Sequence, residues 1–250
     1  MATTKIGISD DGAEAEVEVL GSWASPYSNR VEMALNLKSI PYRLSEERFF
    51  STDDGAKSHR LLRANPVHKK IPVLLHRGRP VCESLIILHY IDDVWAQSGP
   101  SILPSHPYDR ALARFWAAFL DDKWFPALKE MEQATDEASR AGVVGKILEM
   151  TALLEGAFVE IAGNGNSNSR RFFGGDDMGF LDIALGSYLG WVRVLESAVG
   201  VKLFDSSTCP GLAGWVDRFC SHPAARDVVP PSEKLVQFYI AIKSQRKAQS

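Results

Sequence analysis

The sequence predicts a small α/β domain followed by an all-helical domain. Over the first hundred residues, short runs with strand-like alternation are interleaved with runs of helical spacing. From Asp109 onward, apolar residues recur at helical spacing almost throughout. Pro104 and Pro107 lie between these regions and indicate a linker. We therefore expect two domains, at residues 15–97 and 108–245.

The elements of the first domain follow from local patterns. Residues 16–20 alternate polar and apolar side chains, which predicts a half-buried strand. After a turn at 21–25, Pro26 fits the first turn of a helix, because its missing N–H has no cost there, and this helix ends near residue 40. Residues 42–44 and 71–76 are typical of strands, and a tight turn at 77–79 leads into 80–81. Residues 83–95 predict a helix, and the polar segment 46–58 predicts a loop.

The second domain is expected to consist of helices. The apolar spacing predicts helices at about 109–129, 135–161, 179–198, 210–221 and 232–245. Pro126 is expected to bend or end the first of them. The segment 163–169, rich in glycine and asparagine, predicts a flexible loop. Asp182 is expected to cap or stabilise the helix that begins near Gly179, which is a folding role.

Composition and charge exclude several classes of protein. The formal net charge of −3 gives no overall basic field for nucleic acid or anionic lipid. No run of 18 apolar residues indicates a membrane span, and the polar start of the chain argues against a secretory or transit peptide. Cys82, Cys209 and Cys220 show no metal-ligand grouping with histidine and no disulfide framework. A reducing cytoplasm and no metal are therefore expected.

Five segments carry a family resemblance. The segment W-A-S-P-Y at 23–27 precedes a predicted helix, and N-P-V-H-K-K-I-P-V-L at 65–74 is followed by P-V-C-E-S at 80–84. The segments R-F-W at 114–116 and G-F-L-D-I-A at 179–184 lie in the helical part. Over residues 17–242, the chain closely resembles plant tau-class glutathione S-transferases. The resemblance implies a thioredoxin-like first domain, a helical second domain, a homodimer and glutathione as co-substrate.

Ser25 is the catalytic residue that this resemblance implies. A free thiol of this kind has a pKa of about 8.5, so only a few per cent is ionised at pH 7. Lowering that pKa by about two units needs roughly 2.7 kcal/mol of preference for the anion. A serine hydroxyl at the start of a helix donates a charge-assisted hydrogen bond to sulfur, beside N–H groups that favour an anion. The alternative role for Ser25 is a plain helix N-cap.

The resemblance also implies the residues that bind glutathione. The backbone of Ile71, just before an expected cis-Pro72, pairs with the peptide like an added strand. Ser84 and its N–H bind the γ-glutamyl carboxylate, and Glu83 accepts from the ammonium. Lys57 and Lys70 face the glycyl carboxylate. Relative to the family pattern, about five residues are added before Lys57. The full set is Lys57, Lys70, Ile71, Glu83 and Ser84.

A pocket for hydrophobic electrophiles is expected between the domains. An aromatic wall suits flat apolar molecules, although aromatic residues at helical spacing are also typical of plain core. The family often has tyrosine, arginine and tryptophan where this chain has Phe125, Lys129 and Glu132, which bears on substrate preference. The residues implied to line the pocket are Trp23, Tyr27, Arg114, Phe125, Lys129, Trp191 and Phe238.

Conjugation of the glutathione thiolate to electrophiles is therefore the predicted function. Glutathione-dependent peroxidase activity stays open, because it needs only the same thiolate. Thiol transfer and dehydroascorbate reduction need a cysteine in place of Ser25, since a mixed disulfide requires an attacking protein sulfur. A ligandin-like carrier of hydrophobic small molecules, or a fold kept for protein interaction, are the alternatives outside catalysis.

Overall fold

The structure, a computed structural model, describes residues 16–48, 57–131, 134, 136–163 and 171–248. It divides into unit 1, which comprises Met1–Pro100 and Pro223–Ser250, and unit 2, Ser101–His222. The added residues near position 50 and the glycine- and asparagine-rich segment from 164 lie outside the described residues.

A four-stranded sheet in the order β2-β1-β3-β4 forms the centre of unit 1. β1 (Val17–Gly21) runs parallel to β2 (Arg43–Glu46) and antiparallel to β3 (Val73–His76), and β3 runs antiparallel to β4 (Arg79–Cys82). Each predicted strand is confirmed, with boundaries within two residues of the expected ones. The mixed sheet with its flanking helices is the predicted α/β domain.

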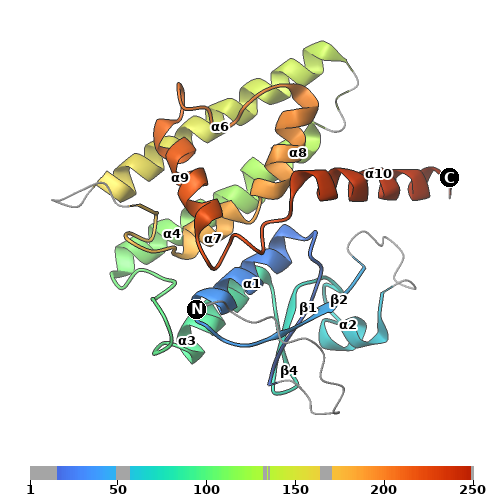
Figure 1. Ribbon diagram of the computed structural model, residues 1–250, viewed down its shortest axis with the longest axis vertical. Helices are drawn as coiled ribbons and strands as arrows, with labels where there is room; N and C mark the ends of the chain where they lie inside the picture. Colours follow the sequence, from blue (N-terminus) through green and yellow to red (C-terminus); the bar gives the residue numbers. More distant parts are fainter. Residues whose placement is uncertain (1–15, 49–56, 132–133, 135, 164–170, 249–250) are drawn as a thin grey trace. The chain divides into compact units, whose positions relative to one another are not determined.

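Helices cover both faces of this sheet. α1 (Pro26–Leu37) and α3 (Ser84–Val94) lie side by side, and α2 (His59–Ala64) lies on the other side of the strands (Figure 1). α2 was not expected from the sequence, because six residues are too few to show helical spacing. It buries Leu61 against an apolar cluster of Leu20, Val73 and Leu75 from the strands.

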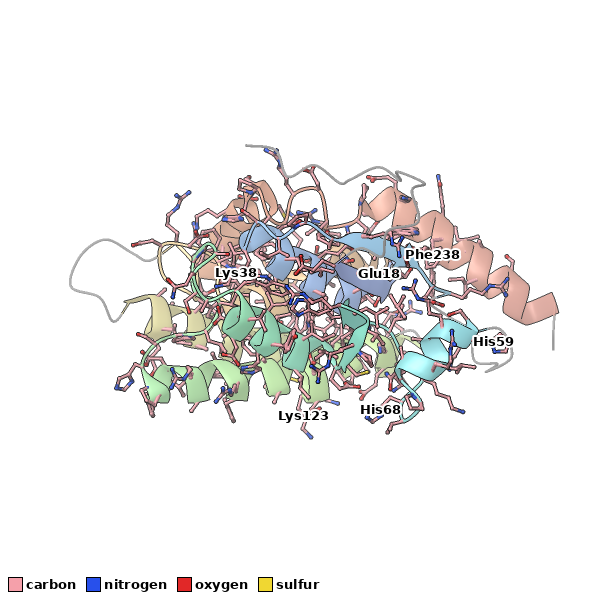
Figure 2. All side chains as sticks on the ribbon, turned by 90° about the horizontal axis from the view of Figure 1, so that it is seen from below. Glu18, Lys38, His59, His68, Lys123 and Phe238 are labelled. Carbon is pink, nitrogen blue, oxygen red and sulfur yellow. The ribbon has the colours of Figure 1, made fainter. Side chains whose placement is uncertain are left out.

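A buried carboxylate, Glu18, fastens α2 to the sheet. Glu18 lies on β1 and is 3% exposed, and it accepts hydrogen bonds from Arg60 of α2 and from Ser45 and Arg43 of β2. Figure 2 labels Glu18 together with His59, the residue that begins α2. Burial opposes ionisation of Glu18, but these hydrogen bonds outweigh it and lower its pKa to about 2.

Replacing Glu18 by glutamine should weaken the fold in a pH-dependent way. The folded pKa of about 2 lies below the ordinary 4.5, so the carboxylate contributes stability above pH 4.5 and loses it as pH falls towards 2. We expect Glu18→Gln to lower the free energy of unfolding by about 2 kcal/mol at pH 7, with the two proteins converging near pH 2. Urea unfolding at several pH values measures this. Glu16→Gln, at an exposed carboxylate, is the matched control, and a gap that persists unchanged at pH 2 contradicts the prediction.

The C-terminal segment packs with unit 1. Asn36 of α1 donates from Nδ2 to the carbonyl oxygen of Ala224 at 3.2 Å, and Trp23 meets Phe238 of α10 (Ser232–Ala248). Residues 223–245 had been expected in the helical domain. In the structure, they belong to unit 1 together with the sheet.

Unit 2 is all-helical, as predicted. The expected first helix is present, and Pro126, which was predicted to bend or end it, does not end it: Pro126 lies in the first turn of a further helix, directly after a π-helical segment. The helix expected at 179–198 is two helices, because the Tyr188 N–H bonds to the carbonyl of Leu185 in a tighter turn. The helices are α4 (Pro107–Phe119), η2 (Leu120–Trp124), α5 (Phe125–Glu130), α6 (Glu137–Gly163), α7 (Phe180–Gly186), α8 (Leu189–Val199) and α9 (Pro210–Ser221).

Asp182 of α7 joins three parts of unit 2. Its fully buried carboxylate accepts from the backbone N–H groups of Phe173, Gly174 and Gly179 and from the indole of Trp215, at 2.7–2.9 Å. The contact with Gly179 is the expected helix cap, and the other three fix the preceding loop and α9 to α7. The described residues of the chain contain no helix long and apolar enough to cross a membrane and no cluster of metal ligands.

Candidate functional site

The strand register brings three chain segments to one end of the sheet. Leu20 pairs with Val73, and Val73 pairs with Cys82, so the end of β1, the start of β3 and the end of β4 are neighbours. Gly21 pairs with Glu46, which adds the end of β2 to the same edge. The segments predicted to activate and bind glutathione all leave the sheet here.

Ser25 lies where β1 turns into α1. Its backbone is extended, with φ −86° and ψ 117°, and its Oγ accepts the N–H of Ser28 at 3.3 Å, so it is the N-cap of α1. The side chain is buried. Because the cap uses an oxygen lone pair, the hydroxyl proton stays available for donation. The two sequence-based roles of Ser25, helix cap and thiol activator, are therefore compatible.

Gly21 allows this turn to close. A Cβ at Gly21 would lie 2.8 Å from Oγ of Ser28, which itself accepts the N–H of Ser22 at 3.1 Å. Ser22 in turn donates from Oγ to Glu46 at 2.6 Å, and the Trp23 N–H donates to the same carboxylate. The turn that presents Ser25 is thus tied to the end of β2.

Arg30 connects the Ser25 helix to the start of α3. This arginine is fully buried, and its Nη1 donates to Oγ of Ser84 at 3.2 Å. Its guanidinium carbon lies 5.1 Å from the ring centroid of Tyr27, one turn before it on α1. Sequence reasoning missed Arg30, because an arginine in an amphipathic helix is typical of a solvated face.

The loop between α2 and β3 presents Lys70 and Ile71. The Ile71–Pro72 peptide is cis, as the resemblance implied. Asn65 is buried; its Nδ2 donates to the carbonyl oxygen of Lys70 at 2.9 Å, while its Oδ1 accepts the N–H of His68. Lys70 itself is exposed. A buried asparagine therefore shapes the loop and leaves the lysine side chain to solvent.

Glu83 and Ser84 lie at the start of α3. Glu83 has a positive φ of 70° and an exposed side chain, and Ser84 is 7% exposed. The side chain of Glu83, the N-cap residue, makes no capping hydrogen bond to α3. An 11-residue helix with an uncapped N-terminus leaves N–H groups for an anion, as the predicted carboxylate binding requires.

Lys57 is positioned by its neighbour Ser58. Oγ of Ser58 caps α2 by accepting the Leu61 N–H and donates to Glu47 at 2.6 Å. The Glu47 N–H donates to the carbonyl oxygen of Gly21 at 2.7 Å. These bonds bring the start of α2, and with it Lys57, to the sheet edge that carries the Ser25 turn.

Trp23 contacts α10 within unit 1. Phe238 meets its ring at a centroid distance of 5.1 Å, and Nζ of Lys234 lies 4.0 Å from the ring centroid. Figure 1 shows α10, in red, starting near the turn from β1 to α1, and Figure 2 labels Phe238 on this helix. Trp23 and Phe238 were predicted to lie together, and Lys234 was missed.

Two of the predicted electrophile residues of unit 2, Phe125 and Lys129, lie together. Phe125 is 7% exposed and stacks on Tyr188 at 3.9 Å between ring centroids, while Nζ of Lys129 lies 4.8 Å from the Phe125 ring. Tyr188 donates from its hydroxyl to Asp121 of η2 at 2.8 Å. Arg114 is exposed on α4 and Trp191 half-buried on α8. The stacking partner Tyr188 was not expected from the sequence.

The three cysteines are unsuited to thiol chemistry. They are free thiols, and burial raises the pKa of Cys82, Cys209 and Cys220. A raised thiol pKa leaves less nucleophilic thiolate at neutral pH. This agrees with a reaction in which the attacking sulfur belongs to a bound thiol.

Comparison with known families and structures follows the same division of the chain. The family model for the glutathione S-transferase N-terminal domain matches residues 24–94, and that for the glutathione S-transferase C-terminal domain matches 115–223. Glutathione S-transferase U17 of Arabidopsis thaliana is 50% identical over 90% of this chain and 95% of its own length. A probable glutathione S-transferase of rice, GSTU6, is 47% identical over 89% of this chain and 92% of its own.

Solved structures show the same likeness. The tau-class glutathione S-transferase of mango is 48% identical and superposes with a TM-score of 0.84, covering 92% of this chain and 99% of its own. Rice GST1, solved in complex with glutathione, is 34% identical with a TM-score of 0.79, over 93% of this chain and all of its own.

Proposed function

Because the chain belongs to the tau class of the glutathione S-transferase family, we propose that it conjugates the thiolate of glutathione to hydrophobic electrophiles, with Ser25 as the activating residue. The observation that carries this proposal is the position of Ser25 at the sheet edge where the segments of Ile71 and Ser84 also emerge. In this role, the buried hydroxyl donates to the sulfur of glutathione and stabilises the anion.

The peptide part of glutathione is assigned to the loops around this edge. Ile71 pairs its backbone with the peptide, and Ser84, with the N–H groups that start α3, binds the γ-glutamyl carboxylate. The exposed Glu83 carboxylate accepts from the ammonium, and Lys57 and Lys70 face the glycyl carboxylate. Arg30 supports this arrangement, because its bond to Ser84 Oγ sets the rotamer of that serine.

The electrophile is assigned to the aromatic residues by resemblance. Trp23, Tyr27 and Phe238 belong to unit 1, and the support for them is that Trp23 and Tyr27 flank Ser25 while Phe238 contacts Trp23. The residues proposed from unit 2 are Arg114, Phe125, Lys129 and Trp191. Reduction of organic hydroperoxides by the same thiolate is a further proposed activity, since it needs no other protein group.

Carriage of hydrophobic molecules is the second candidate function. Unit 2 has a cavity of about 270 Å³ near the start of α4 and the end of α6, with Leu112, Phe173 and Phe180 in its lining. Asp109 and Glu160 also line it, so a cavity of this size fits a small ligand with both apolar and polar groups. A hydrophobic fluorescent dye that binds with the same affinity in the presence of S-hexylglutathione would support a carrier site apart from the glutathione site.

We also propose a cytoplasmic homodimer. The support is apolar surface on both units: Ile86 is 57% exposed on α3, and Phe115 is 61% exposed on α4. A homodimer interface would cover contiguous apolar surface that includes such side chains, and the family resemblance implies a homodimer. The mass in solution, from sedimentation equilibrium, tests this.

Two measurements on the unmodified protein test the proposed reaction. The protein should be retained on glutathione-agarose and released by free glutathione, and it should accelerate the reaction of glutathione with 1-chloro-2,4-dinitrobenzene. Retention without any turnover of a panel of electrophiles would favour the carrier. Absence of both would reject the proposed function.

Two adjacent lysines provide a matched test of glutathione binding. We expect Lys70→Ala to raise the KM for glutathione about three- to tenfold, because an exposed charge-assisted bond to the glycyl carboxylate is lost, and to leave kcat nearly unchanged. Lys69→Ala removes the same charge one residue earlier and should change KM less than twofold. Equal effects of both substitutions would mean that Lys70 acts only through the positive charge that it adds to the loop, and not through a specific contact with the carboxylate.

A further inference from the structure

An ammonium group lies on the ring of Trp23, two residues before Ser25. Nζ of Lys234, in the first turn of α10, is 4.0 Å from the Trp23 ring centroid, well within the range of a cation–π contact. Phe238, one turn further along α10, meets the same indole at 60° between the ring planes. A cation and two aromatic rings are therefore grouped beside the residue assigned to thiol activation.

The charge of Lys234 is not neutralised by a carboxylate. In the parts of the chain that the structure describes, the contact with Trp23 is the interaction that Lys234 makes, and no carboxylate oxygen lies within 4.0 Å of its ammonium. Glu46, the carboxylate tied to the Trp23 backbone, accepts from Ser22 and from the Trp23 N–H with its two oxygens. Among the described residues, the charge next to the indole is therefore the positive charge of Lys234.

The positive charge of Lys234 favours the binding of some electrophiles over others. An aromatic electrophile held beside Trp23 brings its ring substituents to the neighbourhood of the Lys234 ammonium. A neutral substituent gains little from the ammonium, whereas a carboxylate or sulfonate gains a charge-assisted contact. The contact requires no movement of the backbone, because the lysine side chain is long and exposed.

We propose that Lys234 is a specificity-determining residue, which makes this chain favour flat aromatic electrophiles that carry an anionic group over their neutral counterparts. This inference rests on the proposed function, since it assigns a preference within the same site. The competing role for Lys234 is mechanical: its contact with Trp23 would only hold α10 in place and would affect all electrophiles alike.

A pair of matched electrophiles separates the two roles. Methyl 4-chloro-3,5-dinitrobenzoate is neutral, and 4-chloro-3,5-dinitrobenzoate has the same chlorine-bearing carbon between two nitro groups with a free carboxylate in place of the ester. In both, the thiolate sulfur of glutathione forms a bond to the ring carbon that carries chlorine. The carbon–chlorine bond breaks, and chloride leaves with its electron pair. At saturating glutathione, the ratio of kcat/KM for the anionic over the neutral substrate, corrected for the uncatalysed rates, measures the preference.

Four proteins are compared. We expect the ratio to fall about tenfold in Lys234→Met, which keeps the length of the side chain and removes the charge, and to stay within about twofold in Lys234→Arg. Lys202→Met removes one positive charge from an exposed position in unit 2 and should leave the ratio as in the wild type. The preference of the wild type should also decline as salt is added, since salt screens an exposed charge.

Binding of the reaction products makes the test independent of turnover. The dissociation constants of the preformed glutathione conjugates of both substrates, measured by calorimetry, should show the same preference and its loss in Lys234→Met. An unchanged ratio in Lys234→Met, or an equal loss for both compounds, overturns the inference. A wild type that binds the conjugates with the expected preference but turns over neither substrate overturns the proposed function and leaves the assignment of Lys234 standing.

Discussion

Ser25→Ala should lower the rate of glutathione conjugation at pH 7 by about ten- to a hundredfold while glutathione still binds. A hydrogen bond to a charged group contributes about 1.5–3 kcal/mol, which corresponds to about one to two units in the pKa of the thiol. Without the hydroxyl, that pKa returns towards the free value of about 8.5, and the fraction of thiolate at neutral pH falls accordingly. Burial of Ser25 away from water strengthens the bond that is lost.

The pH dependence makes this prediction specific. Because Ser25 acts by favouring the anion, the rate profile of Ser25→Ala at saturating glutathione should move to higher pH, and the two proteins should approach each other above about pH 9, where the thiol ionises without help. The thiolate absorbance near 240 nm of the glutathione complex measures the same pKa directly. A mutant that is slower by a constant factor at every pH would contradict thiol activation by Ser25.

A second N-cap serine separates catalysis from helix capping. Ser58 caps α2 in the same way as Ser25 caps α1, by accepting the N–H three residues ahead. Ser58→Ala should therefore lose a similar stability of about 1 kcal/mol without a shift of the thiol pKa. Ser25→Thr, which keeps a hydroxyl, should retain part of the activity. If Ser58→Ala shifted the thiol pKa as much as Ser25→Ala, the shift would have to be attributed to the fold.

Local patterns were sufficient for the elements that are regular and long. The alternation at 16–20 and the helical spacing after Asp109 predicted the sheet and the helical unit, since period and burial are directly related in such segments. α2 was missed because it has six residues, and its attachment to the sheet depends on Glu18, forty-one residues before it. The two helices at 180–199 were predicted as one, because the break at Tyr188 is a change of hydrogen bonding that leaves the apolar spacing intact.

The local backbone positions of the candidate site residues were predictable from motifs. Ser25, Ile71 and Ser84 occupy turns and helix starts, and short segments such as N-P-V-H-K-K-I-P encode those directly. Arg30 and Lys234 could not be found in this way. Their importance depends on partners that are distant in sequence, Ser84 and Trp23, and a charged residue on a helix carries no sequence mark that separates a buried contact from a solvated one.

Asp182→Ala should be the most destabilising single substitution considered for this protein. Its carboxylate accepts from four donors, three of them backbone N–H groups, and the side chain has no exposed surface. Each buried donor left without an acceptor costs about 1–3 kcal/mol, so the expected loss is about 4 kcal/mol or more. A domain of ordinary stability, about 5–15 kcal/mol, loses much of its margin by this change.

The loop cannot easily move to give these N–H donors other acceptors. A Cβ at Gly174 would lie 2.5 Å from the nitrogen of Gly179, so the two backbone segments are already in close contact around the carboxylate. Burial raises the pKa of Asp182 to about 6, and the four hydrogen bonds oppose that rise. Ionisation of this group therefore costs stability as pH rises through about 6, and the fold tolerates the buried charge only because the four donors offset its desolvation.

The asparagine variant tests whether the four acceptor contacts, and not the volume of the side chain, stabilise unit 2. Asp182→Asn keeps the shape but turns one acceptor oxygen into an NH₂ group that faces two N–H donors, so we expect most of the loss seen with alanine. Trp215→Phe removes a single donor, and Asp176→Ala removes an exposed carboxylate nearby. The first should lower the free energy of unfolding less than Asp182→Asn does, and the second should lower it least. The midpoints of urea unfolding, followed by circular dichroism, give the order of stability of these variants. Where the alanine substitution prevents folding, the yield of soluble protein is compared instead. If asparagine were as stable as the wild type, the hydrogen bonds to the second oxygen would contribute nothing, and the position of Asp182 would be explained by packing alone.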